Sequence, residues 1–227
     1  MSRGAARELI QGGHVKVDGV VIAKAGALVS ADAEIVIDRL PAFVGRGGDK
    51  LEAALRCFEI EAAGRVCLDV GASTGGFTDC LLQHGAAKVY AVENGRGQLA
   101  DVLLRDTRVV SMEETDIRTV DARLFREPLG LAVVDVSFIS LKLVLAPVKA
   151  LLQENADILC LVKPQFEAGR GKVSKRGIVR DAKVRQRALE EVISFAKEIG
   201  LSHHATLPYP DPPPRDKNQE YLIHLKT

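Results

Sequence analysis

The sequence predicts an α/β protein whose main domain has a mostly parallel sheet with helices on both faces, preceded by a small α+β module. Three observations support this prediction. Apolar runs of the buried-strand type alternate with helical patterns, as in parallel sheets with crossover helices. The 227 residues are 47% apolar, which suffices for one substantial α/β core. Residues 40–48, LPAFVGRGG, have the composition of a linker between the two parts.

Residues 1–39 form the small module. A helical pattern over 2–11 ends at two glycines and carries Arg3 and Arg7 on its polar side. Short β runs follow at 14–17, 20–23 and 33–38, and an Asp-Gly turn joins the first two.

Residues 49–227 form the main domain. Its expected strands, each a short apolar run of the buried type, are 65–70, 88–93, 108–112, 131–135, 156–163 and 219–225. Its expected helices are 49–59, 76–84, 96–104, 139–153 and 181–199. The proline-rich stretch PYPDPPPRD before the last strand predicts a loop.

Composition narrows the class of protein. There is no apolar run of 18 residues and no signal-peptide layout at the N-terminus, so we expect a cytoplasmic protein with no membrane partner. The four cysteines lie far apart without a CxxC pair, which favours neither disulfides nor a metal site. The net charge of only +1 does not by itself indicate a polyanionic partner, so such a partner must be argued from local clusters of basic residues. A monomer is favoured.

The stretch LDVGASTGGFT, residues 68–78, runs from a strand into a helix through small residues. A loop at that edge of an open α/β sheet is where such folds bind nucleotide-like ligands. The glycines Gly71, Gly75 and Gly76 do not have the G-x-G-x-x-G spacing of dinucleotide-binding loops. Glu93, at the end of the second strand, instead fits an acid that accepts hydrogen bonds from the ribose hydroxyls of S-adenosylmethionine. The alternative is a tight turn without a ligand. The expected cofactor contacts are Asp69, Gly71, Ala72, Ser73, Gly75, Gly76, Phe77, Glu93 and Asp116.

Asp116 follows the third strand and could accept a hydrogen bond from the adenine amino group. An aspartate that only caps a turn is the alternative. Carboxylates also suit the cationic sulfonium of this cofactor.

Four polar residues fall at strand or helix ends, where an active site would form: Lys50, Asp135, Lys163 and Glu220. A ribose 2′-hydroxyl is a very weak acid, so methyl transfer to it needs a base or strong stabilisation of the alkoxide. A lysine whose pKa is lowered by burial and a second cation can be that base, while a carboxylate orients it. We expect Lys163 in this role, with Lys50 lowering its pKa.

These residues lie in motifs that resemble the TlyA-type, or hemolysin-A, rRNA methyltransferases: RGGDKLEAAL (46–55), DVGASTGGFTD (69–79), VDVSFISL (134–141) and VKPQFEAGR (162–170). The resemblance covers nearly the whole chain. It implies a Rossmann-like class I methyltransferase fold with a seven-stranded sheet and an FtsJ-like K-D-K-E tetrad at Lys50, Asp135, Lys163 and Glu220. It also implies an N-terminal S4-like RNA-binding module and 2′-O-methylation of cytidine, in 23S rRNA first and in 16S rRNA second.

Three departures from that family pattern stand out. Glu93 and Asp116 replace the usual Asp and Asn, and the S4-like pattern begins at its second helix. We therefore expect a curtailed module, or a natural chain with a longer N-terminus.

Residues 170–187 hold eight Lys or Arg against one acid, Asp181, a cluster that could neutralise RNA phosphates. A solvated helix face with a flexible loop is the alternative. Aromatic residues make up only 4%, which favours recognition of folded rRNA or a ribosomal subunit through shape and phosphates. The expected RNA contacts are Arg3, Arg7, Lys16, Arg46, Arg170, Lys172, Lys175 and Arg176.

Three other function classes compete with the methyltransferase. A non-catalytic RNA-binding or ribosome-assembly factor would not need the tetrad. A pore-forming protein, which the hemolysin name suggests, would need amphipathic or membrane-length segments. An NAD or small-molecule enzyme is the remaining structural alternative.

Overall fold

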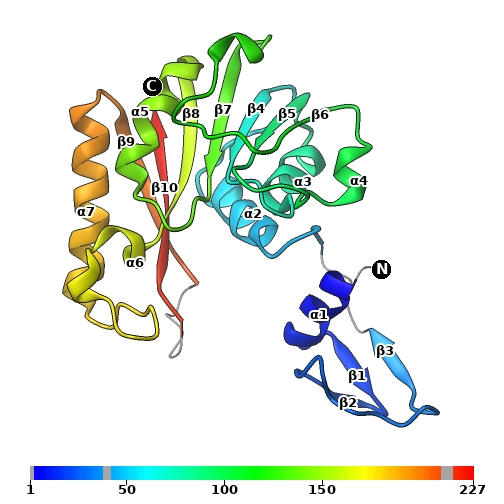
Figure 1. Ribbon diagram of the computed structural model, residues 1–227. Coiled ribbons are helices and arrows are strands. Elements are labelled where there is room, and N and C mark those ends of the chain that lie inside the picture. Colours follow the sequence, from blue (N-terminus) through cyan, green and yellow to red (C-terminus); the bar gives the residue numbers. More distant parts are fainter. Residues whose placement is uncertain (1–2, 38–41, 211–216) are drawn as a thin grey trace.

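A computed structural model describes residues 3–37, 42–210 and 217–227 (Figure 1). The N-terminal module consists of helix α1 (Arg3–Gln11) and strands β1 (Val15–Val17), β2 (Val20–Val21) and β3 (Ile35–Ile37). The strands form an antiparallel sheet in the order β2-β1-β3. The predicted α+β module is therefore confirmed, with strands shorter than expected.

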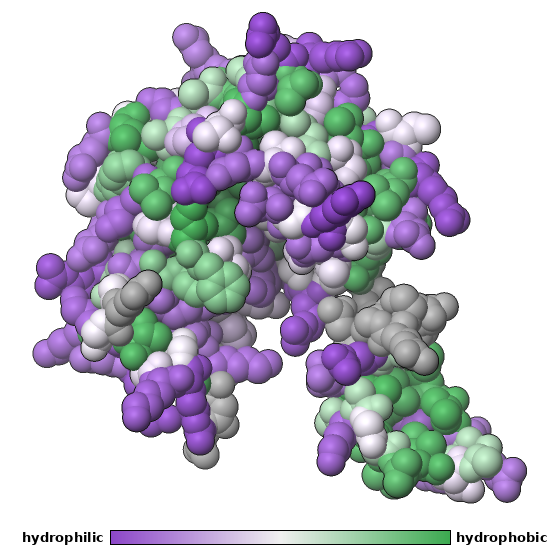
Figure 2. Space-filling model, in the orientation of Figure 1, coloured by the Kyte–Doolittle hydropathy of each residue, from purple (hydrophilic) through white to green (hydrophobic). Residues whose placement is uncertain are grey.

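The module buries little apolar surface. Leu9 and Val15 are its buried hydrophobic residues within the described chain, whereas Val20, Leu28 and Ile35 are largely exposed. Figure 2 shows this as a hydrophobic surface over the module. Its sheet is too small to enclose a core, so its apolar side chains remain in contact with solvent.

The main domain is built on a seven-stranded sheet in the order β6-β5-β4-β7-β8-β10-β9. Its strands are β4 (Val66–Val70), β5 (Lys88–Val92), β6 (Val109–Met112), β7 (Leu129–Val134), β8 (Leu152–Val162), β9 (Ser202–Tyr209) and β10 (Glu220–Lys226). The pairs among β4 to β8 are parallel, and β10 runs antiparallel to both β8 and β9. The predicted mostly parallel sheet is confirmed.

Helices cover both faces of this sheet (Figure 1). They are α2 (Gly47–Cys57), α3 (Gly76–Gln83), α4 (Asp101–Leu104), α5 (Leu145–Leu151), α6 (Pro164–Glu167) and α7 (Ala182–Glu198), with short 3₁₀ turns at Ala122–Leu124, Leu141–Leu143 and Arg170–Lys172. One core cluster joins the sheet to α2 and α3, and the other joins it to α5 and α7. Burial on both faces explains why the central strands are continuous apolar runs.

Several predicted boundaries were wrong. The sequence pattern missed β9, an edge strand that contains Pro208, because its half-buried positions alternate with polar side chains. The helix expected over 139–153 is confined to a 3₁₀ turn and α5, and β8 begins at Leu152. Only Asp101–Leu104 of the expected helix 96–104 is helical.

The expected linker also contributes to the core. Within 40–48, residues 40 and 41 lie outside the described chain, but Phe43 is 5% exposed and belongs to the cluster beneath α2. Helix α2 begins at Gly47, and a Cβ on Gly48 would lie 2.2 Å from the Phe43 ring. Glycine at this position lets the incoming chain pack directly on the helix.

Candidate active site

The candidate site lies where the strand order of the main sheet reverses. Strand β4 is followed in the chain by β5 on one side, while β7 lies on its other side. Ligands of open α/β sheets bind in the crevice at such a switch point, beyond the carboxyl ends of the strands. Gly71 follows β4 with φ +84°, and a Cβ there would lie 2.6 Å from the Asp135 carbonyl oxygen after β7. Glycine is therefore required where these two strand ends meet.

Two cavities share this edge of the sheet, and both are lined by Gly71, Ser73 and Asp135. The first has a volume of about 930 Å³ and extends past the ends of β5 and β6, where Glu93 and Asp116 line it. The second has a volume of about 810 Å³ and extends toward α2 and β10, where Lys50 and Glu220 line it. We call them the carboxylate cavity and the tetrad cavity.

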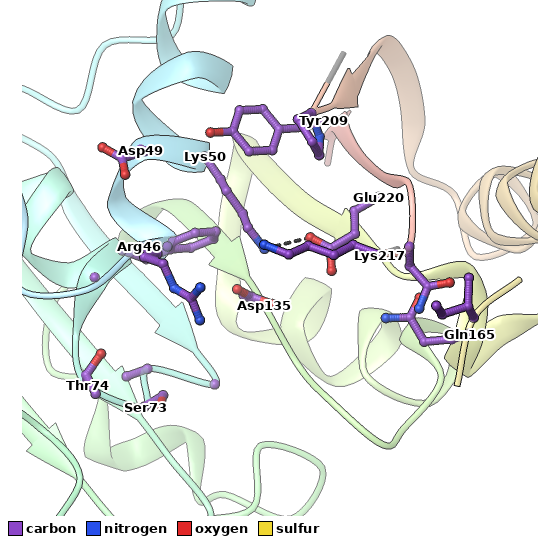
Figure 3. A pocket seen from close by; sticks show the side chains of 18 of the residues that line it. Arg46, Asp49, Lys50, Ser73, Thr74, Asp135, Gln165, Tyr209, Lys217 and Glu220 are labelled. Atoms are coloured by element: carbon purple, nitrogen blue, oxygen red, sulfur yellow. Dashed lines mark hydrogen bonds and ion pairs between the residues drawn. The ribbon is translucent and has the colours of Figure 1, made fainter. Parts of the chain in front are cut away.

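The four predicted catalytic residues form two ion pairs from four elements, and Figure 3 shows the pair of Lys50 and Glu220 in the same cavity as Asp135. Lys50 Nζ in α2 lies 2.6 Å from Glu220 Oε2, the first residue of β10. Lys163 Nζ, after β8, lies 2.6 Å from Asp135 Oδ1, after β7. The Lys163 side chain is only 11% exposed. Two lysines and two carboxylates thus balance their charges around a partly desolvated centre.

The Lys163 amine has a second partner, Ser137. Its Nζ donates a hydrogen bond to Ser137 Oγ at 2.8 Å. The contact with Asp135 Oδ1 has the distance of an ion pair but not the alignment of a hydrogen bond, and that buried oxygen has no hydrogen-bond donor. Asp135 therefore holds the amine through charge, while Ser137 fixes its direction.

Glu93 organises the glycine loop from the carboxylate cavity. Its Oε2 accepts from Ser73 N at 2.9 Å and its Oε1 accepts from Gly95 N at 2.7 Å. A carboxylate oxygen can accept more than one hydrogen bond, so both oxygens retain capacity for ligand hydroxyls. Glu93 therefore contacts the glycine loop, and both were predicted to bind the cofactor.

Asp116 lines the same cavity but is paired within its own turn. Its Oδ2 lies 2.5 Å from Arg118 Nη2, and its Oδ1 accepts from Arg118 N. These hydrogen bonds to Arg118 lower the pKa of Asp116. The turn-capping alternative describes the observed contacts, and the expected adenine contact remains a prediction.

The expected direct cofactor contact of Asp69 remains a prediction, and the observed contact of its side chain is within the protein. Its side chain is fully buried, lines neither cavity, and accepts from Thr78 Oγ1 of α3 at 2.6 Å. Burial raises its pKa to about 7 despite that hydrogen bond, with further contributions from Asp135 and Glu93. Asp69 supports the loop from below.

The other predicted loop residues divide between the cavities. Gly71 and Ser73 line both, whereas Ala72, Gly76 and Phe77 line only the tetrad cavity. Gly75 lines neither and has φ +94°; a Cβ there would lie 2.2 Å from Leu103 and 2.7 Å from Leu99. The absence of a side chain lets the loop pack against these leucines, and the expected contact of Gly75 with a ligand remains a prediction.

The predicted RNA contacts lie on several elements. Arg46 and Arg176 line the tetrad cavity, Lys172 and Lys175 are exposed nearby in the chain, and Arg7 is exposed on α1. Lys16 is half-buried on β1, and the side chains of Arg3 and Arg170 lie outside the described part of the structure.

Sequence reasoning missed three residues that line the cavities. Phe138 is 92% exposed with φ +65°, lies at the carboxylate cavity, and contacts the Phe166 ring with centroids 5.1 Å apart. Gln165 and Lys217 line the tetrad cavity, where Figure 3 labels both. Two of the three had an available signal, since Phe138 and Gln165 follow Asp135 and Lys163 within three residues.

Comparison with known proteins identifies the family. Residues 43–227 match the model of the FtsJ-like methyltransferases, and residues 2–35 match the S4 domain. The chain belongs to the FtsJ-like methyltransferase family. Over 228 residues it is 43% identical to the 16S/23S rRNA (cytidine-2'-O)-methyltransferase TlyA of Mycobacterium tuberculosis, covering all of this chain and 85% of that protein. The family predicted from the motifs is confirmed.

Other proteins similar to this chain carry different names. Hemolysin A of Brachyspira hyodysenteriae is 41% identical, covering 99% of this chain and 93% of that protein. A solved structure named a putative hemolysin from Streptococcus thermophilus superimposes with a TM-score of 0.82 at 38% identity, covering 100% of this chain and 83% of that one. Across the described residues, the structure holds no helix with the length and apolar character needed to span a membrane.

Proposed function

We propose that this protein transfers a methyl group from S-adenosylmethionine to a cytidine ribose 2′-hydroxyl in rRNA. The observation that carries this proposal is a cavity lined by Lys50, Asp135 and Glu220, with Lys163 paired to Asp135, that meets a carboxylate-lined cavity. One cavity suits a cationic cofactor and the other suits a hydroxyl nucleophile. The name of the tuberculosis relative, a cytidine-2'-O-methyltransferase, supports the same reaction.

The residues of the carboxylate cavity fit S-adenosylmethionine. Glu93 offers two anchored oxygens for ribose hydroxyls, and Val92 and Ile117 offer apolar surface for an adenine ring. Its carboxylates also complement the positive sulfonium. When bound, the cofactor supplies an electrophilic methyl group whose carbon–sulfur bond breaks as the new carbon–oxygen bond forms.

The tetrad then handles the proton of the attacking hydroxyl. Lys163, in its neutral form, accepts this proton at Nζ as the ribose oxygen takes the methyl group. Ser137 and Asp135 hold the amine in direction, and the resulting ammonium is balanced by the Asp135 carboxylate. Glu220 keeps Lys50 in the cavity, where its positive charge stabilises the developing alkoxide.

The distribution of unpaired cations supports rRNA as the substrate. On the tetrad side, Arg46, Lys172, Lys175 and Arg176 make no ion pair within the described chain. Elsewhere in the main domain, Arg108, Arg118 and Arg123 are each paired with the aspartate two residues earlier, at 2.5–2.7 Å, and Arg118 lines the carboxylate cavity. Arginines that are already neutralised release few counterions from RNA, so we expect the RNA backbone to lie along the tetrad side.

The exposed ring of Phe138 suits the target base. It lines the carboxylate cavity together with Asp135, the ion-pair partner of Lys163, and aromatic side chains hold unstacked bases by stacking. We propose 23S rRNA as the main substrate and 16S rRNA as the second, with the protein acting as a monomer in the cytoplasm. Two relatives support the 23S assignment, since the names of both the tuberculosis and Campylobacter jejuni proteins include 23S rRNA.

The test is methyl transfer from labelled S-adenosylmethionine to ribosomal subunits and naked rRNA, followed by nucleoside analysis and mapping of 2′-O-methylation. We expect 2′-O-methylcytidine at a defined 23S position. Binding of rRNA without methyl transfer would instead support a non-catalytic assembly factor. Binding of NAD in place of S-adenosylmethionine would overturn the cofactor assignment.

A further inference from the structure

The basic run after β8 contains a closed turn over residues 174–178. Gly177 N donates to Ser174 O at 2.8 Å, and Ser174 N donates to Ile178 O at 3.1 Å. Ser174 Oγ also accepts from Ile178 N at 3.0 Å. Gly177 has φ +76°, which glycine tolerates best. These hydrogen bonds give the cations on this segment a defined backbone conformation.

A single side chain ties this turn to the catalytic strand. Asn218 lies two residues before Glu220, and its Nδ2 donates to Gly177 O at 2.8 Å. Its Oδ1 accepts from Val179 N at 2.9 Å. Val179 is only 1% exposed, so its side chain anchors the end of the turn in the protein. The position of the turn thus follows the position of the strand that carries Glu220.

Only some of the nearby cations line the tetrad cavity. Arg176 does so from the turn, Arg46 from the residue before α2, and Lys217 from the residue before Asn218. All three are exposed and unpaired within the described chain, whereas Lys50 in the same cavity is matched by Glu220. These three cations from three segments outnumber Asp49, an exposed carboxylate that lines the same cavity without an ion pair among the described residues, and they remain available to an anion.

On the basis of the proposed function, we infer that Arg46, Arg176 and Lys217 bind an RNA phosphodiester beside the target ribose. Asn218 is a positioning residue that holds Arg176 in this subsite. Lys172 and Lys175 do not line the cavity and contact phosphates farther along the RNA. The basic segment therefore contains one cation that positions the reacting nucleotide and others that add general affinity.

A double-mutant cycle tests this inference in the full chain. Arg176→Ala should raise the KM for an rRNA fragment by about tenfold, the loss expected for a charge-assisted contact. Asn218→Ala should raise it by about twofold to tenfold, since it removes two neutral hydrogen bonds. If Asn218 acts through Arg176, the double variant should behave like Arg176→Ala alone.

The matched control pairs Asn218→Ala with Arg46→Ala. Arg46 lines the same cavity from a different element, so these two effects should multiply. Gly177→Ala provides a second way to move the turn, because no atom lies within 4 Å of the new Cβ and only the left-handed backbone is disfavoured. It should also raise the KM for RNA and leave the cofactor dissociation constant unchanged.

The salt dependence of RNA binding separates positioning from loss of structure. Arg176→Ala should lower the slope of log affinity against log salt by about one unit. Asn218→Ala should lower it in the wild-type background but not in the Arg176→Ala background. The inference would be overturned if the effects of Asn218→Ala and Arg176→Ala on KM multiplied in the double variant. It would also be overturned if Asn218→Ala left the salt slope of RNA binding unchanged. Absence of rRNA methylation by the wild type would instead overturn the proposed function.

Discussion

The two cavities that meet at Gly71, Ser73 and Asp135 differ in charge, although they are formed by adjacent strand ends. In the carboxylate cavity, the neighbouring arginine Arg118 is neutralised by Asp116. In the tetrad cavity, Arg46 and Arg176 remain unpaired while Lys50 and Glu220 form an ion pair. Electrostatics can thus direct a cationic cofactor and a polyanionic RNA to opposite sides of one loop.

The comparison also shows which groups connect the two sides. Asp135 lines both cavities and carries the charge that holds Lys163. Asp69 lies buried beneath both, and its pKa responds to Asp135 on one side and Glu93 on the other. Substitutions should therefore separate into those that affect one ligand and those that affect the junction.

Substitution of Lys163 at the junction should have the largest effect on catalysis. Lys163→Ala should lower kcat by about 10²–10⁴-fold, the usual contribution of a positioned base. Lys163→Arg should fail as well, because a guanidinium stays protonated. The cofactor dissociation constant should be unchanged, since Glu93 and Gly71 lie on other strands. Single-turnover methyl transfer and calorimetry measure both quantities.

An exposed lysine away from the site, Lys197 near the end of α7, provides the control. Lys197→Ala should retain full activity. If Lys163→Ala also retained near-wild-type turnover, the assignment of the base would be wrong.

Asp69→Asn should change stability in a pH-dependent way. The Asp69 pKa rises from 3.8 to about 7 on folding, so the folded chain binds more protons than the unfolded chain between these values. The wild type should therefore lose up to about 4 kcal/mol of unfolding free energy from this group as pH rises through that window. Asn does not titrate and can still accept from Thr78 Oγ1, so the variant should lack this loss.

Denaturant unfolding at pH 4 to 8 measures the difference between the two proteins. Asp101→Asn, at an exposed position in the first turn of α4, serves as the control and should follow the wild type. Parallel pH profiles for wild type and Asp69→Asn would contradict the proposed effect of burial.

Glu93→Ala should weaken only the carboxylate side. It removes the acceptor for Ser73 N and Gly95 N and the anchored oxygens available to the cofactor. The dissociation constant for S-adenosylmethionine should rise on the order of 10- to 100-fold, as for loss of charge-assisted hydrogen bonds. Affinity for rRNA should stay the same. Glu93→Asp should show a smaller loss, and equal losses for both ligands would argue against two separate binding sides.

The tetrad could be predicted from sequence because strand ends of a parallel sheet converge at one edge. An apolar run followed by Asp135 or Lys163 therefore specifies a position in space. Asp69 and Gly75 could not be assigned in this way. The direction of the Asp69 side chain depends on where α3 packs, and the space around Gly75 depends on two leucines of a later segment.

The local net charge of the sequence predicted the proposed RNA-binding surface less well than the ion pairs in the structure indicate it. The run over 170–187 was recognisable by its composition, but its closed turn depends on Asn218, 39 residues after Val179. A different signal was available for the neutralised arginines. The pattern D-x-R occurs at 106–108, 116–118 and 121–123, and each arginine pairs with its own aspartate. The spacing of opposite charges could therefore have separated the self-paired arginines from those that we propose to contact RNA.

The last substitution should have the smallest effect on RNA affinity at a fixed salt concentration. It tests most directly the difference in charge between the two cavities. Replacing Lys172 and Lys175 together by alanine should lower the salt slope of rRNA binding by about two units, one for each lost phosphate contact. The matched double variant, Arg118→Ala with Arg123→Ala, removes the same number of cations, each of which is already paired with an aspartate. Its slope should equal that of the wild type, because these arginines contribute no free charge to the RNA. Binding of an rRNA fragment at several salt concentrations distinguishes the two variants. Equal slopes for both would mean that RNA responds to total charge, and the division of the protein into an RNA side and a cofactor side would then lose its electrostatic basis.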